Sequence, residues 1–258
     1  MYSRKVLIKQ NCQELLPSYL RFIKGVVDCE DLPLNISRET YQDTSLIMKL
    51  RTVITRRAIK MLEDEAKRNP EKYNAWYSTF QNFLKEGTQM DDENKVALFR
   101  LLRFSVDYTG KKSALISLDD YIQKMVPDQK KIYFTFGSSY DAALSSPFYE
   151  PFKGKDVPVL VLTHQLDEFC LTSTGSYKGM TFENLEQTQI DDIRKELGLD
   201  AGSGSVESGL PEEDVTNFCL WLKDTLSSKV AKVQLSKRLT GTPAVLVGQM
   251  SSSMYMMM

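Results

Sequence analysis

Residues 131–162 have the sequence KIYFTFGSSYDAALSSPFYEPFKGKDVPVLVL. Lys131–Phe136 is rich in aromatic and β-branched residues and predicts a strand, while Val157–Leu162 is a continuous apolar run typical of a buried strand. Tyr140–Leu144, which lies between them, has the pattern of a short helix. Because a helix separates the two strands, we predict a small α/β layer unit with a largely parallel sheet.

Helical patterns flank this unit on both sides. Ser117–Met125 precedes it and Thr188–Leu197 follows it. Beyond the second pattern, 199–211 contains Gly202-Ser203-Gly204-Ser205 and has no apolar periodicity, as is typical of a linker. We therefore place a domain boundary in 199–211.

Upstream of the α/β unit, the pattern predicts three successive helices. The first has Asp43, Thr44 or Ser45 as its N-cap. Its expected core-facing stripe is Leu46, Leu50, Val53, Ile54 and Met61. The second helix follows Pro70, ends at Gly87 as a C-cap and carries an aromatic stripe. This stripe comprises Tyr73, Trp76, Tyr77, Phe80, Phe83 and Leu84, and we interpret it as a buried interhelical seam. The third helix spans 92–103, so 44–103 should form a small helical coil.

The two ends of the chain have weaker patterns. Near the beginning, Val6–Ile8 predicts a strand, Cys12–Lys24 a short helix and 26–42 a loop. Near the end, a helical face at 215–226 precedes two strand-like runs, 229–239 and 244–247. We expect the core of this last unit to be incomplete within this chain.

These patterns together predict an α/β fold of layered αβα units joined by a three-helix coil and followed by a partial α+β unit. The predicted segments are 1–43, 44–104, 105–198, the linker 199–211 and 212–258. A chain of 258 residues is long enough for one or two domains of roughly 150 residues by length alone.

Composition excludes several classes of function. Lys and Arg total 33 against 34 Asp and Glu, so the net charge of -1 gives no general attraction to nucleic acid or to an anionic membrane. No run approaches the roughly 18 apolar residues of a membrane span. The four cysteines lie far apart and His164 is the only histidine, so we predict neither a metal site nor chemistry that needs a histidine base.

The chain shows no complete active site of its own. It has no glycine-rich phosphate-binding motif, because Gly202 and Gly204 form only a linker repeat. Ser37 and the cysteines have no histidine near them in the sequence, and Asp167-Glu168 is an ordinary acidic pair.

One segment, 25–39, has the distinctive sequence GVVDCEDLPLNISRE. With Leu20-Arg21-Phe22 ahead of it, this segment resembles the catalytic-loop signature of the ninety-kDa heat-shock chaperones, the Hsp90 family. The resemblance covers nearly the whole chain. Its later landmarks, in order, are Tyr73–Gly87, Leu101-Leu102-Arg103-Phe104, Ser146-Pro147-Phe148, Asp167-Glu168, Leu239 and Pro243-Ala244. The chain departs from the family pattern at Cys29, Thr40, Tyr41 and Asp43.

The resemblance implies a role in ATP hydrolysis. In that family ATP binds a separate N-terminal domain, and an arginine of the middle domain reaches its γ-phosphate. Arg38 occupies the matching position, Asn35 matches a residue that holds the loop, and Gln42 matches one that contacts the N-terminal domain or phosphate region. The chain alone is expected to be inactive as an ATPase.

The resemblance also implies client proteins and homodimerisation of the full-length protein as partners, with no nucleic acid and no membrane. The short 199–211 connection is similar to that of mitochondrial or bacterial members, which favours a mitochondrial location, with a cytoplasmic one as the alternative. Two other functions remain open from the residues alone. The chain could be a non-enzymatic protein-interaction scaffold, or it could bind RNA through the basic residues between Lys49 and Lys60.

Overall fold

The computed structural model describes residues 1–30, 44–108, 111–112, 114–188, 193, 197, 211–236, 239 and 242–247. It divides the chain into two compact units. Unit 1 comprises Met1–Arg103 with Ser117–Asp119, and unit 2 comprises Phe104–Ile116 with Asp120–Met258. An α/β fold is confirmed, because helices and a mixed sheet make up the described structure. The finer division into five segments stays a prediction.

Unit 1 begins with a short hairpin, in which β1 (Tyr2–Ser3) pairs antiparallel with β2 (Val6–Leu7). The helix predicted over 12–24 is instead two 3-10 turns, η1 (Gln13–Leu15) and η2 (Ser18–Leu20). Leu16 separates them with an extended backbone, φ -135° and ψ 147°. It precedes Pro17, whose ring disfavours the helical conformation of the residue before it.

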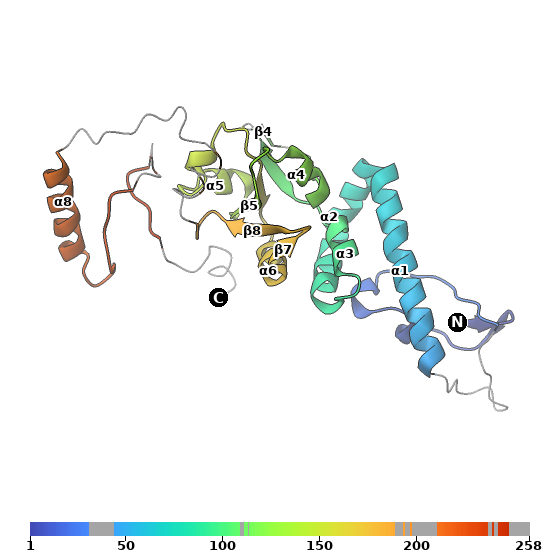
Figure 1. Ribbon diagram of the computed structural model, residues 1–258. Helices are drawn as coiled ribbons and strands as arrows, with labels where there is room; N and C mark the ends of the chain where they lie inside the picture. The colour runs from blue at the N-terminus through green and yellow to red at the C-terminus, as the bar shows by residue number, and fades with distance from the viewer. Residues whose placement is uncertain are drawn as a thin grey trace. The chain divides into compact units, whose positions relative to one another are not determined.

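The three predicted helices are present in unit 1 as α1 (Thr44–Arg68), α2 (Pro70–Met90) and α3 (Lys95–Leu101). Figure 1 shows α1 running beside α2 and α3, which it contacts. The predicted stripe of α1 is partly wrong, because Val53 is 65% and Met61 56% exposed. The buried positions of α1 are Ile47, Thr55, Ala58, Ile59, Leu62 and Ala66. The small Ala and Thr side chains on this face allow close packing. A prediction based on the spacing of large apolar residues does not detect these buried positions.

The aromatic stripe of α2 packs in two places. Tyr73 and Tyr77 are buried, while Phe22, from the segment before α1, lies 5.7 Å from Trp76 and 5.1 Å from Phe80 between ring centroids. Edge-on and tilted ring pairs of this kind stabilise beyond their buried area. The stripe therefore fastens the N-terminal segment to the helices as well as the helices to each other.

Gly87 does not end α2 as predicted, since the helix continues to Met90. Its role is close packing, because a Cβ at this position would lie 2.6 Å from Cδ2 of the Tyr19 ring. That ring is 1% exposed and its hydroxyl donates a hydrogen bond to Asp91, so it has little freedom to move aside. A glycine at 87 lets η2 approach the helix.

We expect Gly87→Ala to lower the free energy of unfolding by about 1–2 kcal/mol. Alanine stabilises a helix relative to glycine by up to about 1 kcal/mol. Overpacking a core costs about 1–3 kcal/mol, and we expect a cost near the upper end of that range because the Tyr19 ring cannot move aside. Urea unfolding of the chain measures the difference. Gly25→Ala is the control, because a Cβ there meets nothing within 4 Å. Equal stability of the two variants would contradict this account of Gly87.

Unit 2 is built on a six-stranded sheet with the order β4-β3-β6-β5-β8-β7. Its strands are β3 (Ser105–Tyr108), β4 (Lys111–Lys112), β5 (Lys131–Phe136), β6 (Val159–Leu162), β7 (Ser176–Tyr177) and β8 (Met180–Asn184). The prediction of a largely parallel sheet is wrong. Only the pairs β5 with β6 and β5 with β8 are parallel, while β3, β4 and β7 add antiparallel pairs at the edges.

Helices cover both faces of this sheet. The chain passes from β5 through α5 (Tyr140–Leu144) to β6, and then through α6 (Gln165–Thr174) back across β5 to β8. Both crossover connections, from β5 to β6 and from β6 to β8, are expected to be right-handed, but they run in opposite directions along the sheet. They therefore place α5 and α6 on opposite faces of the sheet. Figure 1 shows the sheet between α5 and α6, which confirms the αβα layering of this unit.

The remaining elements of unit 2 complete its core and its C-terminal part. The turn η3 (Glu150–Phe152) contributes Phe152 to a cluster with Tyr133, Tyr149 and Val159. The helix α4 (Leu118–Lys124) is pinned by Tyr121, whose buried hydroxyl donates to the carbonyl of Pro158 at 2.6 Å and accepts from the amide of Tyr133 at 3.0 Å. These bonds tie the loop before β6 to β5.

The predicted C-terminal helix is present as α8 (Glu212–Thr225), which has no buried residue. The two strands predicted after it are absent from the described positions of 229–247. Leu235, Leu246 and Val247 there are about three-fifths exposed, at 61%, 60% and 61%. A strand needs a partner for its backbone groups, and no described strand lies beside these residues. Among the described residues, no helix has the length and apolar character needed to cross a membrane.

Candidate functional site

The three predicted site residues, Asn35, Arg38 and Gln42, lie outside the described residues. The structure does describe both flanks of the segment 31–43 that carries them. The functional question for unit 1 is therefore how these flanks are held.

The flank before the segment is tied to β1. The amide of Tyr2 donates to the carbonyl of Val27 at 2.7 Å, and the amide of Cys29 donates to the carbonyl of Tyr2 at 3.0 Å. The side chain of Asp28 accepts from the amide of Lys5 at 3.1 Å in the hairpin turn. These bonds fix the chain up to Cys29 on the edge of the hairpin.

The flank after the segment is the first part of α1. Ile47, 4% exposed, packs with Met1 and Leu15 in a small apolar cluster, which we call the anchor cluster. The partly buried residues packed against it are Ile8, Cys12, Val27, Cys29, Leu46, Leu50 and Ile54. Val27 and Cys29 come from one flank and Leu46, Ile47 and Leu50 from the other. Both ends of the segment therefore rest on one core.

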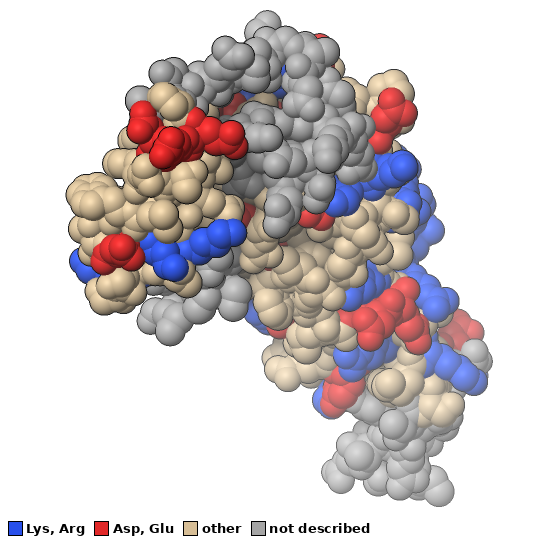
Figure 2. Space-filling model, turned by 60° about the vertical axis from the view of Figure 1, so that its left-hand side comes forward, with Lys and Arg blue, Asp and Glu red and all other residues tan. Residues whose placement is uncertain are grey.

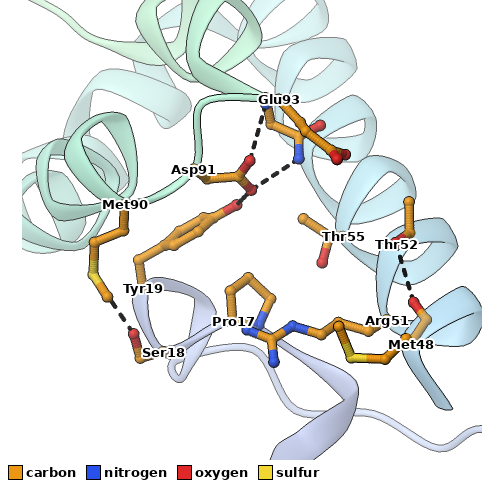
Figure 3. A pocket seen from close by; sticks show the side chains of 11 residues that line it. Pro17, Ser18, Tyr19, Met48, Arg51, Thr52, Thr55, Met90, Asp91 and Glu93 are labelled. Carbon is orange, nitrogen blue, oxygen red and sulfur yellow. Dashed lines mark hydrogen bonds between the residues drawn. The ribbon is translucent and has the colours of Figure 1, made fainter. Parts of the chain in front are cut away.

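A cavity of about 180 Å³ opens on the other side of α1, within unit 1. Figure 3 shows its walls, which come from η2 with the preceding Pro17, the first half of α1 and the turn between α2 and α3. Its polar centre is the hydrogen bond from the Tyr19 hydroxyl to Asp91, 2.5 Å long. This contact joins residues 72 positions apart in the sequence.

Asp91 organises the turn between α2 and α3. Besides Tyr19, its carboxylate accepts from the backbone amide of Asn94 at 3.0 Å and from the side-chain amide at 2.8 Å. Burial acts to raise the pKa of Asp91, but these hydrogen bonds outweigh it and hold that pKa below its usual value. Burial and the bond to Asp91 raise the pKa of Tyr19, so its hydroxyl stays protonated as a donor.

Two further groups face the cavity without using their hydrogen-bonding capacity. The guanidinium of Arg51 has no carboxylate within ion-pair distance among the residues that the structure describes. Thr55 is 3% exposed, and its hydroxyl has no hydrogen bond to any described residue, in contrast to Thr52, which donates to the carbonyl of Met48 at 3.1 Å. Figure 3 shows Thr55 directed into the space above the Arg51 side chain.

The charged residues of α1 form a surface of mixed sign. Lys60 pairs with Asp64 at 3.1 Å, and Arg56 pairs with Glu93 at 3.6 Å. In Figure 2, Lys and Arg lie beside Asp and Glu on the face shown. Such a surface has no uninterrupted basic stripe on that face for a nucleic-acid backbone to follow.

The chemistry available to the described residues is limited. They contain no group of three or more His, Cys, Asp or Glu side chains placed to hold a metal ion. The histidine His164 serves as the N-cap of α6, where its Nδ1 accepts from the amide of Leu166 at 3.4 Å. What the described part of unit 1 offers is an anchored base for the segment 31–43 and a cavity with an unpaired guanidinium.

Sequence reasoning missed the cavity and its residues, Tyr19, Arg51, Thr55 and Asp91. Tyr19 was expected only as part of a short helix, and Arg51 was considered only among the basic residues between Lys49 and Lys60. No local signal singled out Arg51, because Lys49, Arg56 and Arg57 also have no acidic residue three or four positions away.

The chain has a helical unit and then an α/β unit, and a polar segment links the hairpin to the long helix α1. It is therefore a multi-unit α/β protein, and its described residues contain no complete catalytic centre. Comparison with known families shows which family it belongs to. The family model described as "Hsp90 protein" matches residues 1–258. The chain belongs to the Hsp90 family.

Its curated relatives include eukaryotic and bacterial members. The chain is 36% identical over 255 residues to the "TNF receptor-associated protein 1 homolog, mitochondrial" of Dictyostelium discoideum, covering 98% of this chain and 35% of that protein. It is 38% identical over 247 residues to "Chaperone protein HtpG" of Desulfitobacterium hafniense, covering 96% and 39%. The HtpG of Desulfotalea psychrophila is 39% identical over 257 residues, covering 98% and 41%. The chain thus spans about two-fifths or less of the length of these relatives.

Proposed function

We propose that this chain is the middle portion, with the start of the C-terminal portion, of an ATP-dependent molecular chaperone. In this proposal Arg38 extends to the γ-phosphate of ATP bound by an N-terminal domain of the same protein. Family membership over all 258 residues supports the chaperone role. The observation that carries the role of the segment 31–43 is that both of its flanks pack on the anchor cluster.

The chemistry of Arg38 follows from its guanidinium. This planar group presents several donors in a fixed fork, remains charged at every physiological pH and can neutralise the charge on the transferring phosphoryl group. Asn35 would hold the segment through its amide, and Gln42 would contact the N-terminal domain or the phosphate region. ATP is bound mainly by groups outside this chain, so Arg38 contributes to turnover more than to affinity.

The proposal includes client proteins and homodimerisation of the full-length protein as further partners. A non-enzymatic interaction scaffold is the alternative, in which no nucleotide approaches Arg38. A mitochondrial location is also part of the proposal. It is supported by the short 199–211 connection and by the mitochondrial relative, while the bacterial relatives of similar identity support the cytoplasmic alternative. Cell fractionation separates these two locations.

The isolated chain should hydrolyse ATP at a rate indistinguishable from a no-protein control, because the groups that bind the adenine, ribose and magnesium would belong to another domain. The measurement is steady-state phosphate release with the purified chain, alongside the full-length protein as the positive control. Robust turnover by the chain alone that Arg38→Ala leaves unchanged would overturn the proposal.

A further inference from the structure

The cavity between η2, α1 and the turn before α3 holds one charged group without a counter-charge. Arg51 is half-buried, and among the described residues no carboxylate lies within 4 Å of its guanidinium. A guanidinium that loses part of its hydration without gaining a partner is unfavourable, and an incoming anion would relieve this. The uncompensated charge faces a space of about 180 Å³, large enough for a small organic molecule.

A second, independent group faces the same space. Thr55 as a residue is 3% exposed, and its hydroxyl makes no hydrogen bond to a described residue. It lies one helical turn from Arg51 on α1, so both groups project from the same face of the helix. Figure 3 shows Thr55 above the Arg51 side chain, with Tyr19 on the opposite wall. The Thr55 hydroxyl and the Arg51 guanidinium could therefore both donate hydrogen bonds to one acceptor group of a ligand.

The acidic residues of the cavity are already engaged. Asp91 accepts three hydrogen bonds from Tyr19 and Asn94, and Glu93 pairs with Arg56 at 3.6 Å. They leave Arg51 unpaired, but their negative charge disfavours a ligand with two negative charges. A singly charged carboxylate suits the cavity better than a phosphate, and its two oxygens match the planar fork of arginine.

Apolar side chains complete the lining together with Ser18 and Thr52. Met48 and Met90 lie near the mouth, at 54% and 62% exposure, and Pro17 lies beside the Arg51 guanidinium. Methionine side chains adapt to irregular apolar partners. The ligand should therefore carry a short hydrocarbon part next to its carboxylate.

We propose that this cavity binds the carboxylate of a small organic acid, with Arg51 and Thr55 as the donors and Met48 and Met90 against the hydrocarbon part. The proposed ligand is not the nucleotide, so this proposal does not rest on the ATP role of Arg38. It gives unit 1 a means to respond to a ligand other than nucleotide, because the ligand would connect η2, α1 and the turn before α3.

The test uses the 258-residue chain labelled with ¹³C at the methionine methyl groups, and the probe is butyrate. Saturable shifts of the Met48 and Met90 signals are expected with butyrate, and none at equal concentrations of butylammonium. Inorganic phosphate should bind at least about tenfold more weakly than butyrate. If a capped glutamate binds with the same affinity as butyrate, the carboxylate is assigned to a polypeptide side chain. If the capped glutamate binds more weakly, the carboxylate is assigned to a free acid.

Variants identify the donors. Arg51→Gln should weaken butyrate binding by about tenfold or more, and Thr55→Val by a smaller factor of about threefold to tenfold. Arg57→Gln is the matched control, since Arg57 is an exposed arginine on the same helix that does not line the cavity. Butyrate shifts that are absent, that butylammonium reproduces, or that Arg57→Gln alters as much as Arg51→Gln does would overturn the site.

Discussion

Arg38→Ala in the full-length protein should lower kcat for ATP hydrolysis by at least about tenfold while leaving the affinity for ATP nearly unchanged. Arginines that neutralise a transferring phosphoryl group contribute roughly 10³ to 10⁵ in rate elsewhere, and the loss falls on kcat when the contact forms mainly in the transition state. Steady-state hydrolysis gives kcat, and equilibrium binding of ATP gives the affinity.

Two further variants separate the role of the guanidinium from that of charge in general. Arg38→Lys keeps the positive charge but loses the planar fork, so its kcat should lie between those of the alanine variant and the unmodified protein. Arg56→Ala removes an exposed arginine of α1 and should leave kcat unchanged. If Arg38→Ala lowers ATP affinity as much as kcat, the residue binds nucleotide in the ground state and the proposed role is wrong.

The parts of the fold that sequence predicts are those decided by local pattern. Lys131–Phe136, Tyr140–Leu144 and α2 each have enough consecutive residues for their periodicity to show. The edge strands were missed because β4 and β7 have two residues each, too few to alternate. Together with β3, which pairs antiparallel with β6, these short strands make the sheet mixed, so its topology could not follow from the predicted strands β5 and β6 alone.

The candidate site divides in the same way. The segment 25–39 could be chosen as a candidate from the sequence because one contiguous stretch carries the family resemblance. The cavity was not visible, because Tyr19 and Asp91 come together only through tertiary packing of η2 against the end of α2. Gly87 shows the same limit. Its position near the end of a helical pattern suggested a C-cap, whereas its contact with the Tyr19 ring explains why glycine is needed there.

Ile47→Ala in the full-length protein should lower kcat by about tenfold, although Ile47 lies outside the segment that carries Arg38. The side chain joins the anchor cluster on which both flanks of 31–43 rest, so its loss would loosen the base of that segment. A loss of about 1.4 kcal/mol in positioning Arg38 for the transition state corresponds to a tenfold lower rate. ATP affinity should not change, because the nucleotide pocket is elsewhere in the proposal.

The matched control is Ile59→Ala, which removes the same atoms from the same helix. Ile59 is 3% exposed, against 4% for Ile47, but it lies about 18 Å further along α1 and outside the anchor cluster. Both variants should lose about 2–5 kcal/mol of unfolding free energy, since truncating a buried isoleucine leaves a cavity in either place. Only Ile47→Ala should lower kcat, measured where both variants remain folded.

The conservative variant Ile47→Val tests whether Ile47 positions the segment that carries Arg38 or only stabilises the fold. It keeps most of the contact with Met1 and Leu15, so kcat should return to near that of the unmodified protein. A purely structural role for Ile47 would instead make kcat follow stability, and Ile47→Ala and Ile59→Ala would then slow hydrolysis equally. That result would show that the anchor cluster does not affect the action of Arg38. A loss of kcat in Ile47→Ala alone would instead show that the rate depends on how firmly both flanks are held.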